Sequence, residues 1–213
     1  MKTRAVTLMK EDVLALGRLV SDTMQELSRV LKKDSSAQFD NMIKYEEQIN
    51  AACQKIEEKC LDLLNEHKDL TQAENRALVG STLIAAKFER LADHAYRVAK
   101  YVSWVASEDV QIPPEFLEIV GVVSRMVDDV LLCFLTDNVE RIEEIMQRDS
   151  QIDYLHDWLS KQLLQDIGEQ NQEDAQTTMQ LLFCIRYLER MGDACTSVAK
   201  RVHFIVTGKR IGT

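Results

Sequence analysis

The stretch Phe88-Glu89-Arg90-Leu91-Ala92-Asp93-His94-Ala95 decides the fold, because a close copy of it follows one hundred residues later. The copy reads Leu188-Glu189-Arg190-Met191-Gly192-Asp193-Ala194-Cys195. Over fifteen residues, through Val102 and Val202, the two windows share seven identities, among them the Glu-Arg pair and the Asp. Polar residues that recur at fixed offsets indicate a duplicated structural unit.

The composition is that of a globular protein, with 46% apolar and 29% charged residues in a chain of 213. No apolar run approaches the roughly 18 residues of a membrane span, and no signal-peptide core follows the N-terminus. We therefore expect a cytoplasmic protein that does not span a membrane. The net charge of −9 argues against capture of nucleic acid or of an anionic membrane. The five cysteines are odd in number and contain no Cys-x-x-Cys, which predicts reduced thiols.

The chain reads as helix almost throughout, because it holds only seven glycines and two prolines and shows no β-branched alternation. Apolar stripes at helical spacing predict six helices, at about 8–31, 39–67, 72–106, 116–134, 142–163 and 173–206. Pro113-Pro114 cannot continue a helix but can begin one, so it marks the boundary between two halves. We predict an all-α protein of two three-helix bundles, residues 1–110 and 111–213, related by a pseudo-twofold axis.

Carboxylates stand at matching positions of the two halves. Glu and Asp four residues apart lie about 40° apart on a helix and about 6 Å along it, so their oxygens reach toward the same point. The second and fifth helices add two comparable pairs, Glu46 with Asn50 and Asp149 with Asp153. Asp149 stands where the next apolar residue of its stripe is due, and Glu46 interrupts the second helix in the same way.

An acid at the edge of a core costs several kcal/mol unless it meets a metal, an arginine or a proton. Packing of the helices side by side would make two acidic clusters, Glu46 with Glu89 and Asp93, and Asp149 and Asp153 with Glu189 and Asp193. Such clusters suit hard cations with oxygen ligands: iron, manganese, magnesium or calcium. The alternative is that Arg90 and Arg190 neutralise the acids. In the second half the sequence favours a metal over neutralisation by arginine. In the first half it favours neither, because Asn50 removes a charge.

The chain resembles the PhoU family of phosphate-signalling regulators. The resemblance lies in Glu-Arg-x-x-Asp-His-Ala at 89–95, Glu-Arg-Met-Gly-Asp-Ala at 189–194, the acidic-x-x-Ile-Asp pattern at 149–153, and the ending at 205–211. It implies two three-helix bundles and surface multinuclear metal clusters, usually of iron. The implied ligands are Glu89, Asp93, Asp149, Asp153, Glu189 and Asp193, with Glu46 less secure; Asn50 departs from the pattern, and His94 reads as a surface or packing residue.

The resemblance also implies a function. It predicts a non-enzymatic brake on phosphate uptake and on the starvation response, with two partners, the ATPase of a phosphate ABC transporter and a membrane sensor histidine kinase. The oligomeric state, including a homodimer, is left open. No nucleophilic triad or Gly-rich phosphate loop is visible, so direct phosphate binding has no support from the sequence, and a metal-bridged phosphate stays open.

Two other classes compete with the regulator. A ferritin-like di-iron carboxylate protein needs Glu-x-x-His pairs on two helices, and only Asp153-Tyr-Leu-His156 approaches that spacing. A metal-free helical adaptor, whose acids are a solvated face, is the other class. It predicts that purified protein carries no metal under any loading condition.

Overall fold

The structure is a computed structural model that describes residues 4–34, 39–105, 111–167 and 172–211. These residues form six α-helices and contain no strand, which confirms the all-α prediction. The first helix begins at Arg4 instead of near residue 8. The helices are α1 (Arg4–Leu31), α2 (Phe39–Glu66), α3 (Gln72–Val105), α4 (Pro114–Thr136), α5 (Ile142–Ile167) and α6 (Gln172–Thr207).

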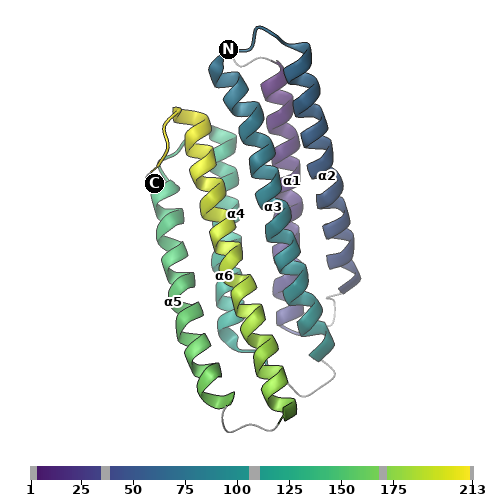
Figure 1. Cartoon of the computed structure of the whole chain (residues 1–213), viewed down its shortest axis with the longest axis vertical. Helices are drawn as coiled ribbons and strands as arrows, with labels where there is room; N and C mark the ends of the chain where they lie inside the picture. Colours follow the sequence, from purple (N-terminus) through teal and green to yellow (C-terminus); the bar gives the residue numbers. More distant parts are fainter. Residues whose placement is uncertain (1–3, 35–38, 106–110, 168–171, 212–213) are drawn as a thin grey trace.

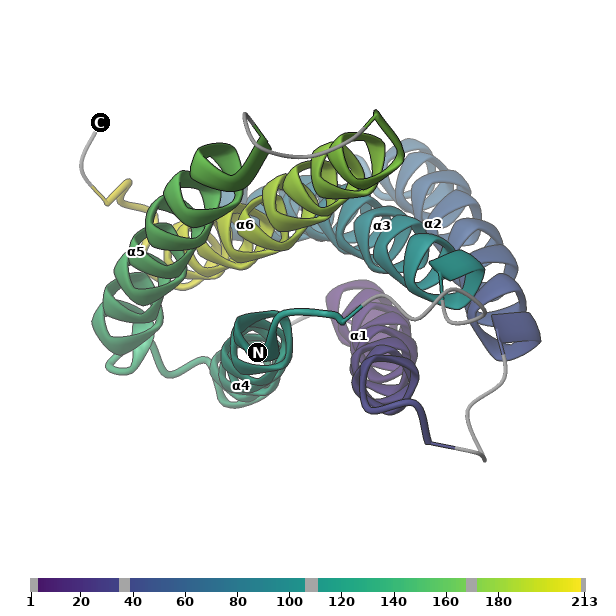
Figure 2. The same ribbon diagram turned by 90° about the horizontal axis from the view of Figure 1, so that it is seen from below.

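The six helices form two layers. Figure 2 shows α5, α6, α3 and α2 in a curved row, with α4 and α1 packed against its concave side. Within each half, every helix contacts the other two, as in a three-helix bundle. Two further contacts join the halves, α3 with α6 and α1 with α4, and Figure 1 shows α3 and α6 side by side at the centre. The two bundles therefore share a central seam.

Local sequence signals set the helix ends. Thr71 and Glu74 form a capping box at the start of α3: Glu74 N donates to Thr71 Oγ1 at 3.3 Å, and Thr71 N donates to Glu74 Oε2 at 2.9 Å. Pro114 opens α4, as the double proline predicts. Gly208 ends α6 with a φ of 72°, a conformation that favours glycine.

Side chains from all six helices form one continuous buried core. Because the apolar stripes of both halves face the same interior, the core runs across the boundary at Pro113-Pro114. The core has members from each helix that are at most 1% exposed, for example Leu16, Met42, Phe88, Phe116, Ile152 and Leu188. The five cysteines are free and buried. Burial raises the pKa of Cys53 and of Cys184 to about 12, so these thiols are poor metal ligands.

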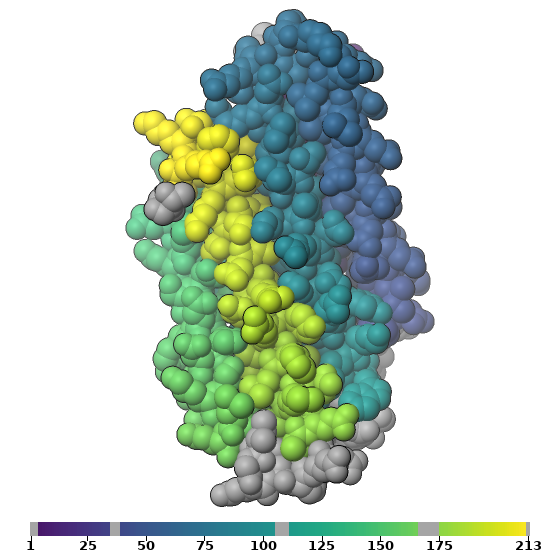
Figure 3. Space-filling model, in the orientation of Figure 1, coloured from purple at the N-terminus to yellow at the C-terminus, as the bar shows by residue number. Residues whose placement is uncertain are grey.

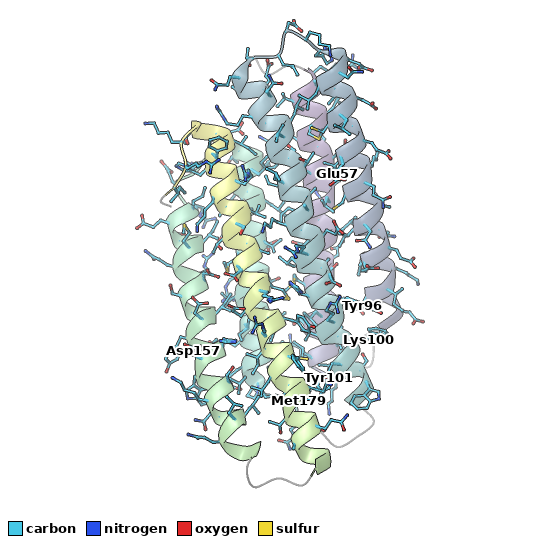
Figure 4. The ribbon with its side chains drawn as sticks, viewed as in Figure 1. Glu57, Tyr96, Lys100, Tyr101, Asp157 and Met179 are labelled. Atoms are coloured by element: carbon cyan, nitrogen blue, oxygen red, sulfur yellow. The ribbon has the colours of Figure 1, made fainter. Side chains whose placement is uncertain are left out.

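The seam between α3 and α6 is antiparallel and close. Tyr101, near the end of α3, donates its hydroxyl to the Thr177 carbonyl oxygen at 3.1 Å, and Figure 4 shows Tyr101 beside α6 near Met179. At the other end, Arg76 Nε donates to the Ile205 carbonyl oxygen at 3.3 Å. These contacts place the two copies of the duplicated motif opposite each other, halfway along the seam.

Within the described part of the chain, no helix has the length and the apolarity that crossing a bilayer requires.

Candidate metal centre

The acids of the second half gather between α5 and α6, and Asp149 lies deepest among them. Asp149 is half-buried, and its Oδ1 is buried without a hydrogen-bond partner in the described structure. Gly192 on α6 provides the space: a Cβ at this position would lie 2.8 Å from Asp149 Oδ1 and 2.8 Å from Ile152 Cδ1. The carboxylate of α5 therefore rests against bare backbone of α6. The small residue at this point of the motif is what permits the approach.

The electrostatics show that these acids act on one another. Burial raises the pKa of Asp149 to about 6, and the negative charges of Asp153, Asp193 and Glu189 add to the rise. Lys200 opposes it as the smallest of these effects. The pKa of Glu189 is also raised, first by burial and then by Asp193. Asp149 and Glu189 thus lie near other negative charges that raise their pKa values, while Lys200 opposes the rise at Asp149 and His156 and Arg186 oppose it at Glu189.

Among the described residues, no basic side chain forms an ion pair with any of the four carboxylates. Arg190, which could have neutralised Glu189, instead lines a hollow between α3 and α6. A half-buried acid can be stabilised by a metal, an arginine or a proton. Because no arginine pairs with these acids among the described residues, a metal and a proton are the two partners left.

The donor atoms are carboxylate oxygens, the kind that hard cations prefer, but the side chains do not converge on one point. Across the described ranges, no three His, Cys, Asp or Glu side chains are placed as the ligands of a single ion. Three features suit iron, manganese, magnesium or calcium. They are the buried Asp149 oxygen without a hydrogen-bond partner among the described residues, the space beside it that a Cβ at Gly192 would fill, and the group of oxygen donors around it.

The acids of the first half have partners from the protein. Asp93 accepts hydrogen bonds from Arg97 Nε at 2.9 and 3.2 Å, and Glu46 Oε1 accepts one from Asn50 Nδ2 at 2.7 Å. Glu89 is exposed. The seven predicted ligands are therefore placed differently in the two halves. Four of them lie together at α5 and α6. Of the other three, Glu46 is hydrogen-bonded to Asn50 and Asp93 to Arg97.

The sequence reasoning missed Arg97, although a signal was present. Asp93 and Arg97 are four residues apart, the spacing at which opposite charges pair on a helix. The matching residue of the second copy is Ser197, so Asp193 has no such partner. A comparison of the two copies beyond the motif itself shows the difference. The first half is less negative at two matching positions: it has Arg97 where the second half has Ser197, and Asn50 where the second half has Asp153.

The fold and the duplicated acidic motif define a class of proteins, the all-helical proteins that are built from two repeats of a three-helix bundle. The family model described as the PhoU domain matches residues 13–102 and 116–202. The chain therefore belongs to the PhoU family. The two matched segments correspond to the two helical bundles, and each of them contains one copy of the motif.

Curated relatives match over nearly their whole length. A "Phosphate-specific transport system accessory protein PhoU homolog" of Clostridium acetobutylicum is 26% identical over 94% of this chain and 91% of its own. A protein of the same description from Streptococcus pneumoniae is 26% identical over 95% of this chain and 94% of its own.

Solved structures show the same fold. The crystal structure of the phosphate transport system regulatory protein PhoU from Streptococcus pneumoniae superposes with a TM-score of 0.86 at 23% identity, covering 98% of both chains. That of PhoU from Pseudomonas aeruginosa gives 0.89 at 21% identity, covering 98% of this chain and 100% of its own.

Proposed function

We propose that this protein is a non-enzymatic accessory regulator of phosphate uptake and of phosphate-starvation signalling. The observation that carries the proposal is the match of the PhoU model to both repeats, together with relatives of nearly equal length that are named as accessory proteins of phosphate transport. Its partners in this role are the ATPase of a phosphate ABC transporter and a sensor histidine kinase, both reached from the cytoplasm.

The proposal includes a metal centre in the second half. Asp149, Asp153, Glu189 and Asp193 would hold a cluster of hard cations, iron first, at the junction of α5 and α6. When bound, these cations would supply positive charge to four carboxylates that form no ion pair among the described residues. The chain's own contribution is the close approach at Gly192, which keeps Asp149 at the edge of the core. The first-half acids Glu46, Glu89 and Asp93 would bind cations less tightly, because Asn50 and Arg97 already engage two of them.

Loss of the gene tests the regulatory role. Cells that lack it should express phosphate-starvation genes in phosphate-rich medium, and the wild-type gene should restore repression. Unchanged expression on deletion would exclude the role. Complementation with the Asp149→Asn, Asp193→Asn double variant then asks whether regulation needs the metal centre, because the regulator and its metal are separate parts of the proposal.

A further inference from the structure

A basic hollow runs along the junction of α3 and α6, the two helices that adjoin on the face seen in Figure 3. It consists of two adjoining cavities of about 560 and 500 Å³, which share Lys87, Arg90, Ser197 and Lys200 in their walls. Six cationic residues line it although the chain carries a net charge of −9. They are Lys87, Arg90, Arg190, Lys200, Arg201 and Arg210.

In the described ranges these cations lack acidic partners: none of the six forms an ion pair, and Asp193 is the one acid that lines the two cavities. Because α3 and α6 are antiparallel, the duplicated Glu-Arg pairs bring Arg90 and Arg190 into the same hollow. Like charges that gather without a counter-charge create a strong local positive potential, which attracts an anion.

Further polar groups complete the walls. His94 stacks on Tyr187 with ring centroids 5.4 Å apart, and its Nδ1 is buried without a hydrogen-bond partner among the described residues. Thr196 and Ser197 also line the hollow, and the Thr196 hydroxyl donates to the Asp193 carbonyl oxygen at 2.9 Å. The hollow therefore combines cations with other polar groups.

We propose that this hollow binds a small molecule that carries several phosphate groups. Guanidinium groups pair with phosphate oxygens through two parallel hydrogen bonds, and lysine ammonium groups add point charges. Volumes of about 500 Å³ are those of small-molecule sites and leave room for more than one phosphate group. The wall formed by Leu83, Phe204 and Ile211 is apolar, so an inorganic polyphosphate and a nucleoside polyphosphate both have the required chemistry. Four of the six cations are exposed, namely Arg90, Arg190, Lys200 and Arg210, so an anion in solution can reach the hollow. The volumes of the two cavities match a compact ligand better than an acidic protein segment.

Binding of phosphate groups in this hollow does not require the metal centre. One residue, Asp193, allows an experiment to distinguish direct binding from binding through a metal. Asp193 lies among the proposed metal ligands and also lines the hollow. If phosphate groups contact the cations directly, Asp193→Asn removes a repulsive charge and strengthens binding. If instead a metal held by Asp193 bridges to phosphate, the same substitution weakens binding. The sign of the effect, measured in protein loaded with manganese, distinguishes the two arrangements.

Calorimetric titration of the full chain with tripolyphosphate, ATP, orthophosphate and hexaglutamate tests the proposal, in chelator and at about 0.15 M salt, where long-range attraction is screened. We expect tripolyphosphate, ATP or both to bind more tightly than orthophosphate. Tighter binding of ATP than of tripolyphosphate would assign a nucleoside to the apolar wall, and tighter binding of tripolyphosphate would assign an inorganic polyphosphate. Equal binding would assign the site to the triphosphate group that the two share. Binding of both that is no tighter than that of orthophosphate, or tighter binding of hexaglutamate, would overturn the proposal.

Matched variants locate the site. Arg90→Ala with Arg190→Ala should weaken binding by about tenfold or more, because two guanidinium contacts are lost. The control is Arg18→Ala with Arg125→Ala, two exposed arginines on α1 and α4 whose removal changes the net charge equally. The control should retain affinity within about twofold. Equal losses in both double variants, or weaker binding by Asp193→Asn, would overturn the proposal. Far-ultraviolet circular dichroism checks that each variant is folded.

Discussion

The surroundings of Asp149 are unfavourable for a free negative charge. One of its oxygens is buried without a partner among the described residues, and three acids lie near enough to raise its pKa. The stripe of apolar residues on the fifth helix predicted that an acid would interrupt the core at this point, and it does. A proton is the alternative to a metal as the partner of Asp149. The pH dependence of the stability of metal-free protein therefore shows whether the folded state favours protonated Asp149.

In metal-free protein, Asp149→Asn should raise stability at neutral pH. The folded state raises the pKa of Asp149 from 3.8 to about 6 and so holds the proton more tightly than the unfolded chain does. The free energy of unfolding therefore falls as the pH rises from about 4 to about 6. Asparagine avoids this loss, which we put at about 1–2 kcal/mol after allowance for partial solvent screening.

Urea denaturation in chelator at several pH values measures the difference between wild type and Asp149→Asn. The gain should be present at pH 7.5 and should vanish below about pH 4, where the unfolded chain is protonated as well. Glu143→Gln, which removes a charge from an exposed site on the same helix, serves as the control and should change little. Equal stability of Asp149→Asn and wild type at pH 7.5 would contradict the prediction.

The candidate site was predictable from the sequence only in part. The spacing of Glu189 and Asp193 and the place of Asp149 in its stripe indicated an acidic group in the second half. The sequence also favoured the second half over the first, because Asn50 removes a charge there, but it did not reveal that Asp93 pairs with Arg97. Motif matching does not reveal such a pair, because the basic partner lies outside the motif and its match in the second copy is Ser197.

The contact between α5 and α6 depends on a position without a side chain. The spacing of apolar residues predicts that a helix packs, but it does not predict how closely two helices approach. That distance is set by individual side chains at the contact, here by Gly192 against Asp149 and Ile152. The first half has Ala92 at the matching position. The antiparallel seam of α3 and α6 was likewise beyond the apolar pattern, because it uses polar contacts such as that of Tyr101 with a backbone carbonyl.

Gly192→Ala should destabilise the protein by about 1–3 kcal/mol, because the added Cβ would lie 2.8 Å from both Asp149 Oδ1 and Ile152 Cδ1. It should also lower the affinity for cations by displacing Asp149. Gly121→Ala on α4 is the matched control, since its Cβ would meet only Arg125 Nη1 at 3.8 Å. The control should stabilise by about 0.5–1 kcal/mol through helix propensity. Thermal denaturation of both variants measures this, and a shift of the same sign in both would be the contrary result.

On the scale of the whole molecule, the two repeats share one core. Six amphipathic helices and a proline boundary predicted two bundles, and the structure shows two bundles whose buried side chains form a single cluster. Two separate cores would have left the inner faces of α1, α3, α4 and α6 exposed. The extent of burial across the seam could not be predicted from the apolar stripes, because each stripe shows that a face is buried but not which helix covers it.

The two halves should therefore unfold together. The chain has two tryptophans, Trp104 in α3 and Trp158 in α5, so each half carries its own fluorescent reporter. In urea, Trp104→Phe and Trp158→Phe proteins should show fluorescence transitions that coincide with loss of helical circular dichroism in the same variant. Separate fluorescence and helix transitions would instead indicate that residues 1–110 and 111–213 are independent folding units.

The metal content of the loaded protein is the most direct test of the acidic group. Elemental analysis after loading with iron or manganese should find metal in the wild type and a large loss in the Asp149→Asn, Asp193→Asn double variant. The first-half variant Glu46→Gln, Asp93→Asn should retain most of it, because those acids already have protein partners. Equal metal content in the wild type and the second-half variant would contradict a metal centre between α5 and α6.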